Sequence, residues 1–586
     1  MLGQTNAGIA ATKPRFSRAS LLSFLGAELV LHAVSAANSI AWRQNRAEPA
    51  LPRRLVRIVV TLPATVGATE AAQAVARLEA AVKLLWTALG WNAGPHVFAP
   101  PTVELAADTA TCAQLGFLEN EITHKFGGKA RQYFDLVGRG RQGRGTTRGL
   151  RLATLDIGGS STGLAIRAWR LDEAGGLASD GLLVEGFRLG GDDVARTIAE
   201  RILLPAIAQR LSQCKVADPQ RLLASLLGSD TKAPTTRQDE LRRRFASEIA
   251  LPAAIRLLEE SDVARTGRDD GPATHTLGDL LSAAGRGHQP SAGAQSLAEE
   301  IEAIAADEGA DGFELMRIEI AVTRPDVTAT ARRVLAPALA CAARAIGNLG
   351  CDQVLITGWL ARLPVIAEAL LQGVPLRPDR IVAVNQYRVG DWYPDRSEAD
   401  NIADPKSLAA VGAVLASRPS PVIGGLPLRN PGSLAQRPAA RSYVGPMLAN
   451  GQIADDAVLF EPGQGASGRD DGGKTPRATL AGEPPFVLGL RRAPLESWPA
   501  LPLYRLELAD MAADARPRLP LRITLGWQGG GTSSIGCPVV LRALDADGID
   551  LAPGEIEMRP NTLGAEDGHW LDTGLFRVDC APTVER

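Results

Sequence analysis

A short stretch of the chain gathers residue types that could bind an anion. Residues 156–162 read Asp-Ile-Gly-Gly-Ser-Ser-Thr, so one carboxylate, two glycines and three hydroxyls lie within seven positions. Adjacent glycines let backbone N–H groups approach an anion because no Cβ stands in the way, and hydroxyls add donors. A carboxylate beside them suits a hydrated Mg²⁺ ion or a water directed at a phosphoryl group. The candidate donors are Gly158, Gly159, Ser160, Ser161 and Thr162, and the candidate metal-binding and catalytic carboxylate is that of Asp156.

Apolar runs on both sides of this segment position it. Residues 152–155 are a short apolar run, and residues 164–169 alternate between apolar and polar. Two strands joined by a glycine turn are therefore expected. An ordinary Gly-Ser hairpin turn with a surface carboxylate has the same residues, so this segment alone leaves both interpretations open.

A second segment, residues 351–371, has the order strand, glycine turn, helix. Residues 354–357 are an apolar strand, Gly358 is the turn, and Pro364 stands in the first helical turn, where its missing N–H would have no partner anyway. An α/β sheet presents its backbone to a nucleotide in this way. The two segments together, and neither alone, indicate a nucleotide site.

Together the two segments resemble the ATPase domain shared by actin and Hsp70-type chaperones. DIGGSST is similar to the second phosphate motif of that superfamily, and TGWLARLP is similar to its adenosine motif. Further similar segments follow in the expected order between residues 51 and 415: RIVVTLPATV in the first lobe, LAADTATCAQLGFL in its connecting helix, FRLGGDDVARTI after the hairpin, and DPKSLAAVGAVL as the closing helix.

Within that superfamily the chain resembles the virulence factor SrfB family of bacteria. The segments that carry this resemblance are FSRASLLSFLGAELV, NEITHKFGGKARQYFDLVGR, ESWPALPLYRLELAD with RLPLRITL, and EDGHWLDTGLFRV. They extend over nearly the whole chain. The resemblance implies a virulence-associated protein.

The superfamily resemblance implies a fold and a cofactor. The fold would be α/β: an actin-like (ribonuclease H-like) two-lobed ATPase fold, followed here by a C-terminal β domain. The cofactors would be ATP and Mg²⁺, with the phosphates held by residues 158–162, Mg²⁺ held by Asp156 through water, and the adenosine bordered by Gly358 and Arg362. Asp108 is a further candidate for the acid that orients the attacking water. A helix N-cap explains an Asp before Thr-Ala-Thr equally well.

The departures from the superfamily pattern concern catalysis. Residues 1–50 supply no Asp-x-Gly hairpin, so the first lobe is expected to be incomplete. Ser160 stands where the second phosphate motif usually has its third glycine, and Gly163 replaces its second Asp. In the adenosine motif Trp359 and Ala361 replace a Gly and a Ser. An indole at this position would either block the base or stack on it. Weak or lost hydrolysis is the prediction.

Composition excludes several other classes of protein. The 586 residues include 63 basic and 65 acidic residues, a balance that calls for no nucleic acid partner and no anionic membrane. The six cysteines form no CxxC pair and the six histidines no HExxH pattern, so a structural zinc site is not expected. Reduced thiols in the cytoplasm are the expectation.

The N-terminal segment imitates a signal peptide. Lys13, Arg15 and Arg18 precede a long apolar run with small residues after it. Glu28 and His32 interrupt that run, and a carboxylate is costly at the centre of a bilayer. A mostly buried globular helix is therefore predicted, with no export signal and no membrane span.

The chain length predicts several domains. We expect an N-terminal helical segment (1–50), a partial first lobe (51–150), a second lobe with a helical insertion (151–415), a Pro/Gly-rich linker (416–480) and a β-rich domain (481–586). Within the second lobe, helices are expected over residues 193–260 and 294–306 and from about 327 to 349, where Pro337 should kink the helix or divide it. Alternation at residues 504–508 and 519–525 predicts strands of the β domain, with Trp498, Trp527 and Trp570 in its core.

Three functions remain open at this stage. The first is an ATP-dependent conformational switch of weak or lost hydrolysis, whose partners would be other proteins such as products of a shared operon. The second is a non-catalytic scaffold that keeps the fold. The third is a sugar or acetate kinase of the same superfamily, for which no acceptor-activating residue can be identified.

Overall fold

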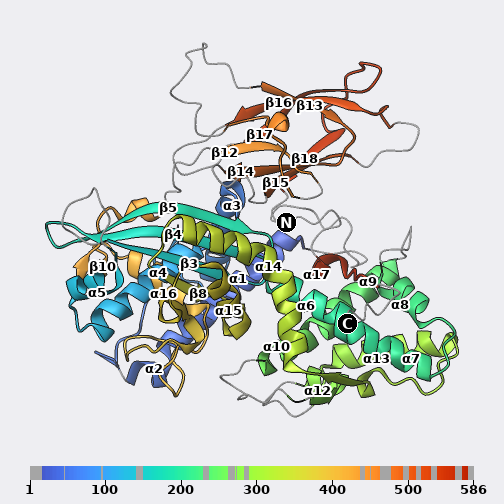
Figure 1. The fold of residues 1–586 in the computed structure, drawn as a ribbon, viewed down its shortest axis with the longest axis horizontal. Coiled ribbons are helices and arrows are strands. Elements are labelled where there is room, and N and C mark those ends of the chain that lie inside the picture. The colour runs from blue at the N-terminus through green and yellow to red at the C-terminus, as the bar shows by residue number, and fades with distance from the viewer. Residues whose placement is uncertain are drawn as a thin grey trace. The chain divides into compact units, whose positions relative to one another are not determined.

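The computed structural model describes most of the chain (Figure 1). The described residues are 16–44, 46–93, 97–139, 149–228, 236–261, 271, 273–282, 289–435, 442–448, 451–461, 477–492, 500–509, 516–528, 537–560 and 570–578. They form a mixed α/β structure with several sheets, which agrees with the predicted α/β class.

The chain divides into two compact units. The first unit comprises Met1–Thr154, Gly163–Gly186 and Lys406–Thr562. The second unit comprises Leu155–Thr162, Phe187–Pro405 and Leu563–Arg586. The hairpin turn and the glycine turn singled out in the sequence both belong to the second unit, whereas Asp108 belongs to the first.

The first unit begins with a small βαβ arrangement. Its elements are α1 (Arg18–Asn38), α2 (Ile40–Gln44), β1 (Arg57–Val60), α3 (Ala68–Ala88) and β2 (Thr102–Leu105). β1 and β2 pair in parallel from Arg57↔Thr102 to Val60↔Leu105, with α3 as the crossover. α1 packs on α3 through Val30, which joins a buried cluster with Val82, Leu85 and Trp86.

Further helices of the first unit are α4 (Thr109–Asn120), a π-helical turn (Glu121–Lys125), α5 (Ala130–Val137) and α16 (Ser407–Ala416). α4 and α16 pack closely because glycines face the contact. A Cβ on Gly412 would overlap the Cys112 carbonyl group, and one on Gly116 would lie 2.7 Å from Leu408 Cδ1. Helix α4 is almost entirely buried, so its polar residues need partners inside the protein: the Gln114 side chain donates to the carbonyl oxygens of Leu152 and Ala165.

The largest sheet has the strand order β5-β4-β3-β8-β9. Its strands are β3 (Gly149–Ile157), β4 (Thr162–Leu171), β5 (Leu177–Phe187), β8 (Gln353–Thr357) and β9 (Ile381–Ala383). The predicted hairpin is therefore confirmed as β3 and β4, and the predicted apolar strand as β8. Every residue of β8 is buried, as expected for a strand with neighbours on both sides and covered faces.

The rest of the second unit is mostly helical, as the sequence predicts. Its helices are α6 (Gly191–Ile198), α7 (Leu204–Gln213), α8 (Pro219–Leu227), α9 (Thr236–Arg244), α10 (Leu251–Glu260), α12 (Leu277–Leu281), α13 (Ala292–Asp307), α14 (Arg324–Asn348) and α15 (Pro364–Gly373), with π-helical turns at Ala199–Leu203 and Phe245–Ala250. Strands β6 (Ala273–Thr276) and β7 (Glu319–Val322) pair antiparallel. Helix α14 continues through Pro337 as one helix and is not divided there.

Seven strands after the helical region form two sheets around one core (Figure 1). One sheet has the order β12 (Ser442–Pro446), β14 (Phe486–Arg492), β15 (Leu501–Leu508), β18 (Ile556–Pro560); the other has β13 (Arg477–Gly482), β16 (Leu521–Gln528), β17 (Cys537–Leu544). A short pair, β10 (Val422–Ile423) and β11 (Leu426–Pro427), precedes them. The predicted strands at 504–508 and 519–525 are confirmed as β15 and β16.

The three tryptophans assigned to that core differ in where they lie. Trp527 packs against the β core and lies 5.2 Å from Phe460, ring centre to ring centre. Trp570 was assigned wrongly: it lies in α17 (Trp570–Thr573), where its ring packs on Phe576, which in turn contacts Phe245 of the helical unit. Trp498 lies outside the described residues.

The predicted burial of the N-terminal helix is also wrong. Ala19–Asn38 is long and apolar enough to cross a membrane by length and composition only, with a mean hydropathy of 1.5, and only 22% of that window is buried. The helix packs on α3 along one narrow side, and its large apolar residues lie on the outside. Hydrophobicity alone could not reveal this arrangement.

Candidate functional site

A backbone hydrogen bond closes the turn between β3 and β4. The Gly158 N–H donates to the Ser161 carbonyl oxygen at 2.9 Å. Gly159 is exposed and Ser160 half-buried, so the tip of the turn faces solvent, whereas Ser161 and Thr162 are buried. Asp156, one residue before the end of β3, is half-buried. The turn therefore offers its exposed tip to a ligand.

The turn is clamped onto the N-terminus of α6. The Gly191 N–H donates to the Gly158 carbonyl oxygen at 2.9 Å, and the Asp192 N–H donates to the Gly159 carbonyl oxygen at 2.8 Å. Two N–H groups of the helix terminus, which have no partner within the helix, are thus bonded to the hairpin. The clamp orients the turn carbonyls inward, away from any ligand at the tip.

The Thr162 hydroxyl belongs to this clamp. It donates to the Leu189 carbonyl oxygen at 2.7 Å. A Ser or Thr hydroxyl has a single hydrogen to donate, so this hydroxyl holds the 189–193 segment and has no hydrogen left for an anion. Of the predicted phosphate donors, Thr162 therefore fixes the loop before α6 in this structure.

Glycine is required at two positions around the turn. A Cβ on Gly190 would overlap the Gly159 carbonyl group. Gly358 has φ +87°, and a Cβ there would overlap the backbone of Ile157. Only backbone fits at these contacts, so the glycine turn after β8 and the loop before α6 both lie directly against the hairpin.

A carboxylate lies beside the exposed tip. A Cβ built on Gly159 would lie 3.2 Å from Asp192 Oδ1. With Asp156 at the end of β3, two acidic residues flank the turn. Carboxylates repel a bare phosphate but suit a hydrated divalent cation that carries one. The residues present therefore fit Mg²⁺-phosphate better than free phosphate. Among the described residues no group of three His, Cys, Asp or Glu side chains is placed to hold a metal by itself.

Trp359 packs on the same clamp. A Cβ on Gly191 would lie 2.6 Å from Trp359 Cε3 and 2.8 Å from Cζ3, so the indole lies directly against the first residue of α6. The side chain is half-buried. The indole that the sequence placed at the adenosine turn thus contacts the segment that holds the phosphate hairpin.

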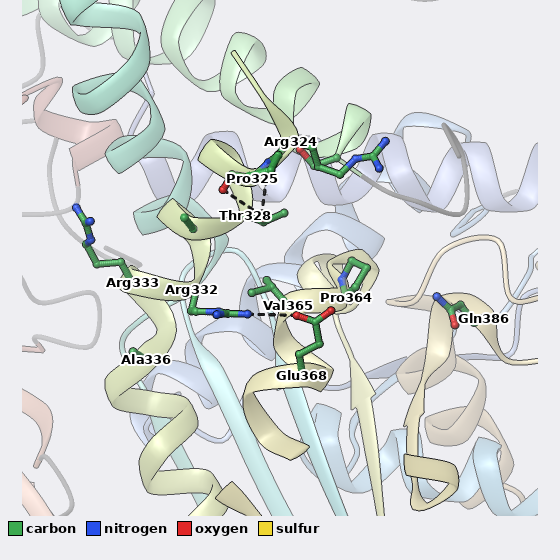
Figure 2. Close-up of a pocket in the computed structure, with 12 residues that line it drawn as sticks. Arg324, Pro325, Thr328, Arg332, Arg333, Ala336, Pro364, Val365, Glu368 and Gln386 are labelled. Carbon is green, nitrogen blue, oxygen red and sulfur yellow. Dashed lines mark hydrogen bonds and ion pairs between the residues drawn. The ribbon is translucent and has the colours of Figure 1, made fainter. Parts of the chain in front are cut away.

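A groove of about 1050 Å³ opens between α14 and α15 (Figure 2). Arg332 of α14 reaches Glu368 of α15, with Nη2 3.2 Å from Oε2 (Figure 2). The polar residues that line the groove are Ser261, Arg324, Thr328, Arg332, Arg333, Glu368 and Gln386. Three arginines and one glutamate give the lining of the groove an excess of positive charge.

The groove begins just past the predicted adenosine residues. Pro364 and Val365 at the start of α15 line it, whereas Gly358 and Arg362 do not. Arg362 ends the 3₁₀ turn Trp359–Arg362 and is half-buried. The sequence analysis missed the arginines of α14. The available signal was TRPDVTATARR, a Thr-x-x-Asp helix start followed by paired arginines two turns later.

Asp108 is the N-cap of α4. Its carboxylate accepts a hydrogen bond from the Thr111 N–H at 3.0 Å, which confirms the cap interpretation of this residue. It lies near Cys112, whose pKa is raised to about 12, chiefly by burial and then by the negative charge of Asp108. The nearby guanidinium of Arg167 is fully buried and donates to Ser179 Oγ at 2.7 Å. These contacts explain Asp108 within the first unit.

Comparison with known proteins gives one family. Residues 2–577 match the family described as Virulence factor SrfB, which is nearly the whole chain. No curated protein matches the chain.

Proposed function

The chain belongs to the virulence factor SrfB family, and we propose that it serves virulence as a nucleotide-binding conformational switch of the actin/Hsp70 type whose ATP hydrolysis is weak or lost. The proposal rests on the clamped hairpin: a glycine turn with an exposed tip, fixed from behind by the N-terminus of α6 and the glycine turn after β8. A preorganised backbone turn of this kind binds an anion without paying to order a loop.

The sheet order supports the proposal. β3 of the hairpin and β8, which leads into Gly358, are neighbours in the order β5-β4-β3-β8-β9. Two sequence segments almost two hundred residues apart, each resembling a nucleotide motif, thus meet at one end of neighbouring strands. Ligands of α/β sheets bind at the carboxyl ends of strands.

In this proposal two regions of the second unit hold different parts of one nucleotide. The exposed backbone at Gly159 and Ser160 would hold the phosphates, with Asp156 and Asp192 holding the water shell of Mg²⁺. Bound Mg²⁺ would neutralise the phosphates and draw charge from their oxygens. The groove between α14 and α15, which begins at Pro364 just after the predicted adenosine turn, would take the adenosine end. Arg332 and Glu368 would border it from its two sides.

Calorimetry with Mg²⁺-ATP and Mg²⁺-ADP on the full chain tests this proposal. We expect binding that Asp156→Asn weakens by about tenfold or more, because carboxylates that orient a metal's ligands contribute about that much to metal affinity. The loss should vanish in EDTA, where no cation connects this carboxylate to the phosphates. Arg332→Ala should weaken ATP binding and leave inorganic phosphate binding unchanged. Arg317→Ala is the matched control, since it removes another exposed ion-pair arginine of the second unit, paired with Glu314.

A second candidate is a scaffold that binds no nucleotide, and Trp359 favours it. The indole lies on Gly191, within the clamp of the hairpin, where it occupies space near the turn. The variant Trp359→Ala separates the candidates. If the indole stacks on a base, the variant loses ATP affinity; if it fills the site, the variant gains binding that the natural protein lacks. No binding at millimolar ATP by either protein would leave only a scaffold without a usable site.

A further inference from the structure

Helix α1 contacts the protein through its small residues. Ala19, Ser23 and Val30 are buried, Val30 in a cluster with residues of α3, and a Cβ on Gly26 would lie 3.1 Å from the Ala81 Cβ of α3. These positions recur every three or four residues and form one face of the helix. Among the described residues, α1 thus packs along a narrow strip of mostly small residues, the small-residue strip, in which Val30 is the largest buried side chain.

The large apolar side chains of α1 point the other way. They form what we call the α1 outer face: Leu21, Leu22, Phe24, Leu25, Leu29 and Leu31. Leu25 is 55% exposed and Leu29 60%. Of the 23 large hydrophobic side chains exposed among the described residues, nine fall between Phe16 and Trp42. An apolar surface concentrated in this way marks a contact with a partner or a membrane.

Basic residues flank this face in the sequence. Residues 13–56 contain seven basic residues and two acidic ones, a net charge of +5 in a chain whose total is −2. One acidic residue, Glu28, pairs with His32 on the exposed side of the helix at 3.4 Å. The segment that carries the apolar surface is therefore the one with strongly positive charge.

The described contacts place basic residues at the C-terminal end of α1. The Asn38 side chain donates to the Arg53 carbonyl oxygen and accepts from the Arg53 N–H, at 2.9 and 2.7 Å, so the following loop folds back on the helix. Arg46 stacks on Trp42 at 3.9 Å. Arg18 lies in the first helical turn, and the 21-residue helix separates the two basic ends by about 30 Å.

We propose that the α1 outer face docks this protein in the plane of an anionic lipid bilayer. Leucines and Phe24 between two basic ends match an interfacial helix, whose apolar side faces the acyl boundary, while arginines and the Glu28–His32 pair on the same exposed side stay at the headgroups. The helix lies on the bilayer and does not cross it, because its small-residue strip and Asn38 hold it to the protein. Two copies of this chain facing each other would bring two positive segments together, so the charge favours lipid over self-association.

Vesicle co-sedimentation of the full chain tests the proposal. We compare vesicles of phosphatidylcholine alone with vesicles that also contain phosphatidylglycerol, at low and high salt. The test variant is Leu25→Glu with Leu29→Glu, both at exposed positions where a carboxylate is hydrated in the free protein. The control is Leu541→Glu, at a leucine of β17 that is 46% exposed. Light scattering after size exclusion gives the mass of each protein.

The expected result is binding to the anionic vesicles that weakens with salt, and a loss of about tenfold or more in partition for the double variant only. Equal binding to neutral vesicles would overturn the charge argument. Absence of binding, or binding that the double variant retains, would overturn the proposal. A natural dimer that the double variant separates into monomers would identify the outer face as a subunit interface instead.

Discussion

Replacing Gly191 by alanine tests the contact between the hairpin clamp and the indole. Gly191 is the first residue of α6 and its φ is not positive, so alanine can adopt its backbone. In open space the substitution would stabilise the protein by about 0.4–1 kcal/mol, because alanine restricts the unfolded chain. Here the new Cβ would lie 2.6 Å from Trp359 Cε3. Trp359 begins the 3₁₀ turn and its indole is half-buried, so it is not the free end of a flexible side chain that could move aside.

The magnitude follows from the overlap. Forcing a methyl group into a packed contact costs about 1–3 kcal/mol. In the Trp359→Ala background the atoms that obstruct the Cβ are gone, so Gly191→Ala should be neutral or stabilising by about 0.4–1 kcal/mol. The coupling energy of the double-mutant cycle should therefore be about 1–4 kcal/mol, above the value for non-contacting residues.

Hydrogen exchange of the peptide that covers α6 is the suitable assay. The chain has more than one compact unit, so one global unfolding energy would not isolate the clamp. The Gly191 and Asp192 amides donate to the hairpin carbonyls and report its opening directly. The cost of about 1–3 kcal/mol in the Gly191→Ala variant should accelerate the exchange of these amides by about five- to a hundredfold, since about 1.4 kcal/mol corresponds to a factor of ten. An equal effect of Gly191→Ala with Trp359 and with Ala at position 359 would refute the contact, and with it the argument that the indole occupies space at the hairpin turn.

Three other predictions concern single interactions. Thr162→Val leaves the Leu189 carbonyl without its 2.7 Å partner and should raise the same exchange rates through a loss of about 1–3 kcal/mol, whereas Thr162→Ser should retain protection. Thr323→Ala removes the N-cap of α14, which accepts from the Asp326 N–H, and should lower the free energy of opening at the start of α14 by about 1 kcal/mol, measured by hydrogen exchange of the peptide that covers it. The raised pKa of Cys112 means that the folded state favours the neutral thiol. Its contribution to the folding free energy is complete below the ordinary pKa of 9.0 and is lost as pH rises toward about 12. Cys112→Ala should therefore flatten the decline of stability at alkaline pH, and an unchanged decline would contradict this prediction.

Much of the site region could be predicted because its determinants are local. Apolar runs around Gly158 gave the hairpin, an apolar run before Gly358 gave β8, and Asp before Thr-Ala-Thr gave a helix cap at Asp108. Each depends on residues a few positions apart. The clamp was harder to foresee, because the bonds of Gly191 and Thr162 join segments about thirty residues apart and involve backbone atoms that every sequence has.

The wrong and missing predictions concern which face of a helix packs and which segments of the chain meet. Periodicity shows that α1 is apolar but does not show that its small residues pack and its leucines stay outside. Trp570 follows a run of strands, and only the fold brings it to Phe245. The sequence indicates that the paired arginines of the groove are charges on a helix. It does not indicate that α15 lies opposite them, because tertiary packing determines which helix is the neighbour. Sequence patterns determine elements here, and their neighbours are determined by the fold.

The position of the last described segment has a consequence for genetics and for cloning. Phe576 donates its N–H to the Leu227 carbonyl oxygen at 2.9 Å, and the Arg577 N–H donates to Glu200 at 2.8 Å. A stop codon just before Trp570 would look harmless, since it spares every strand that the structure describes. It would nevertheless uncover Phe245, leave the Leu227 carbonyl at the end of α8 without this partner and remove the backbone donor to Glu200, so the shortened product should be degraded by proteases.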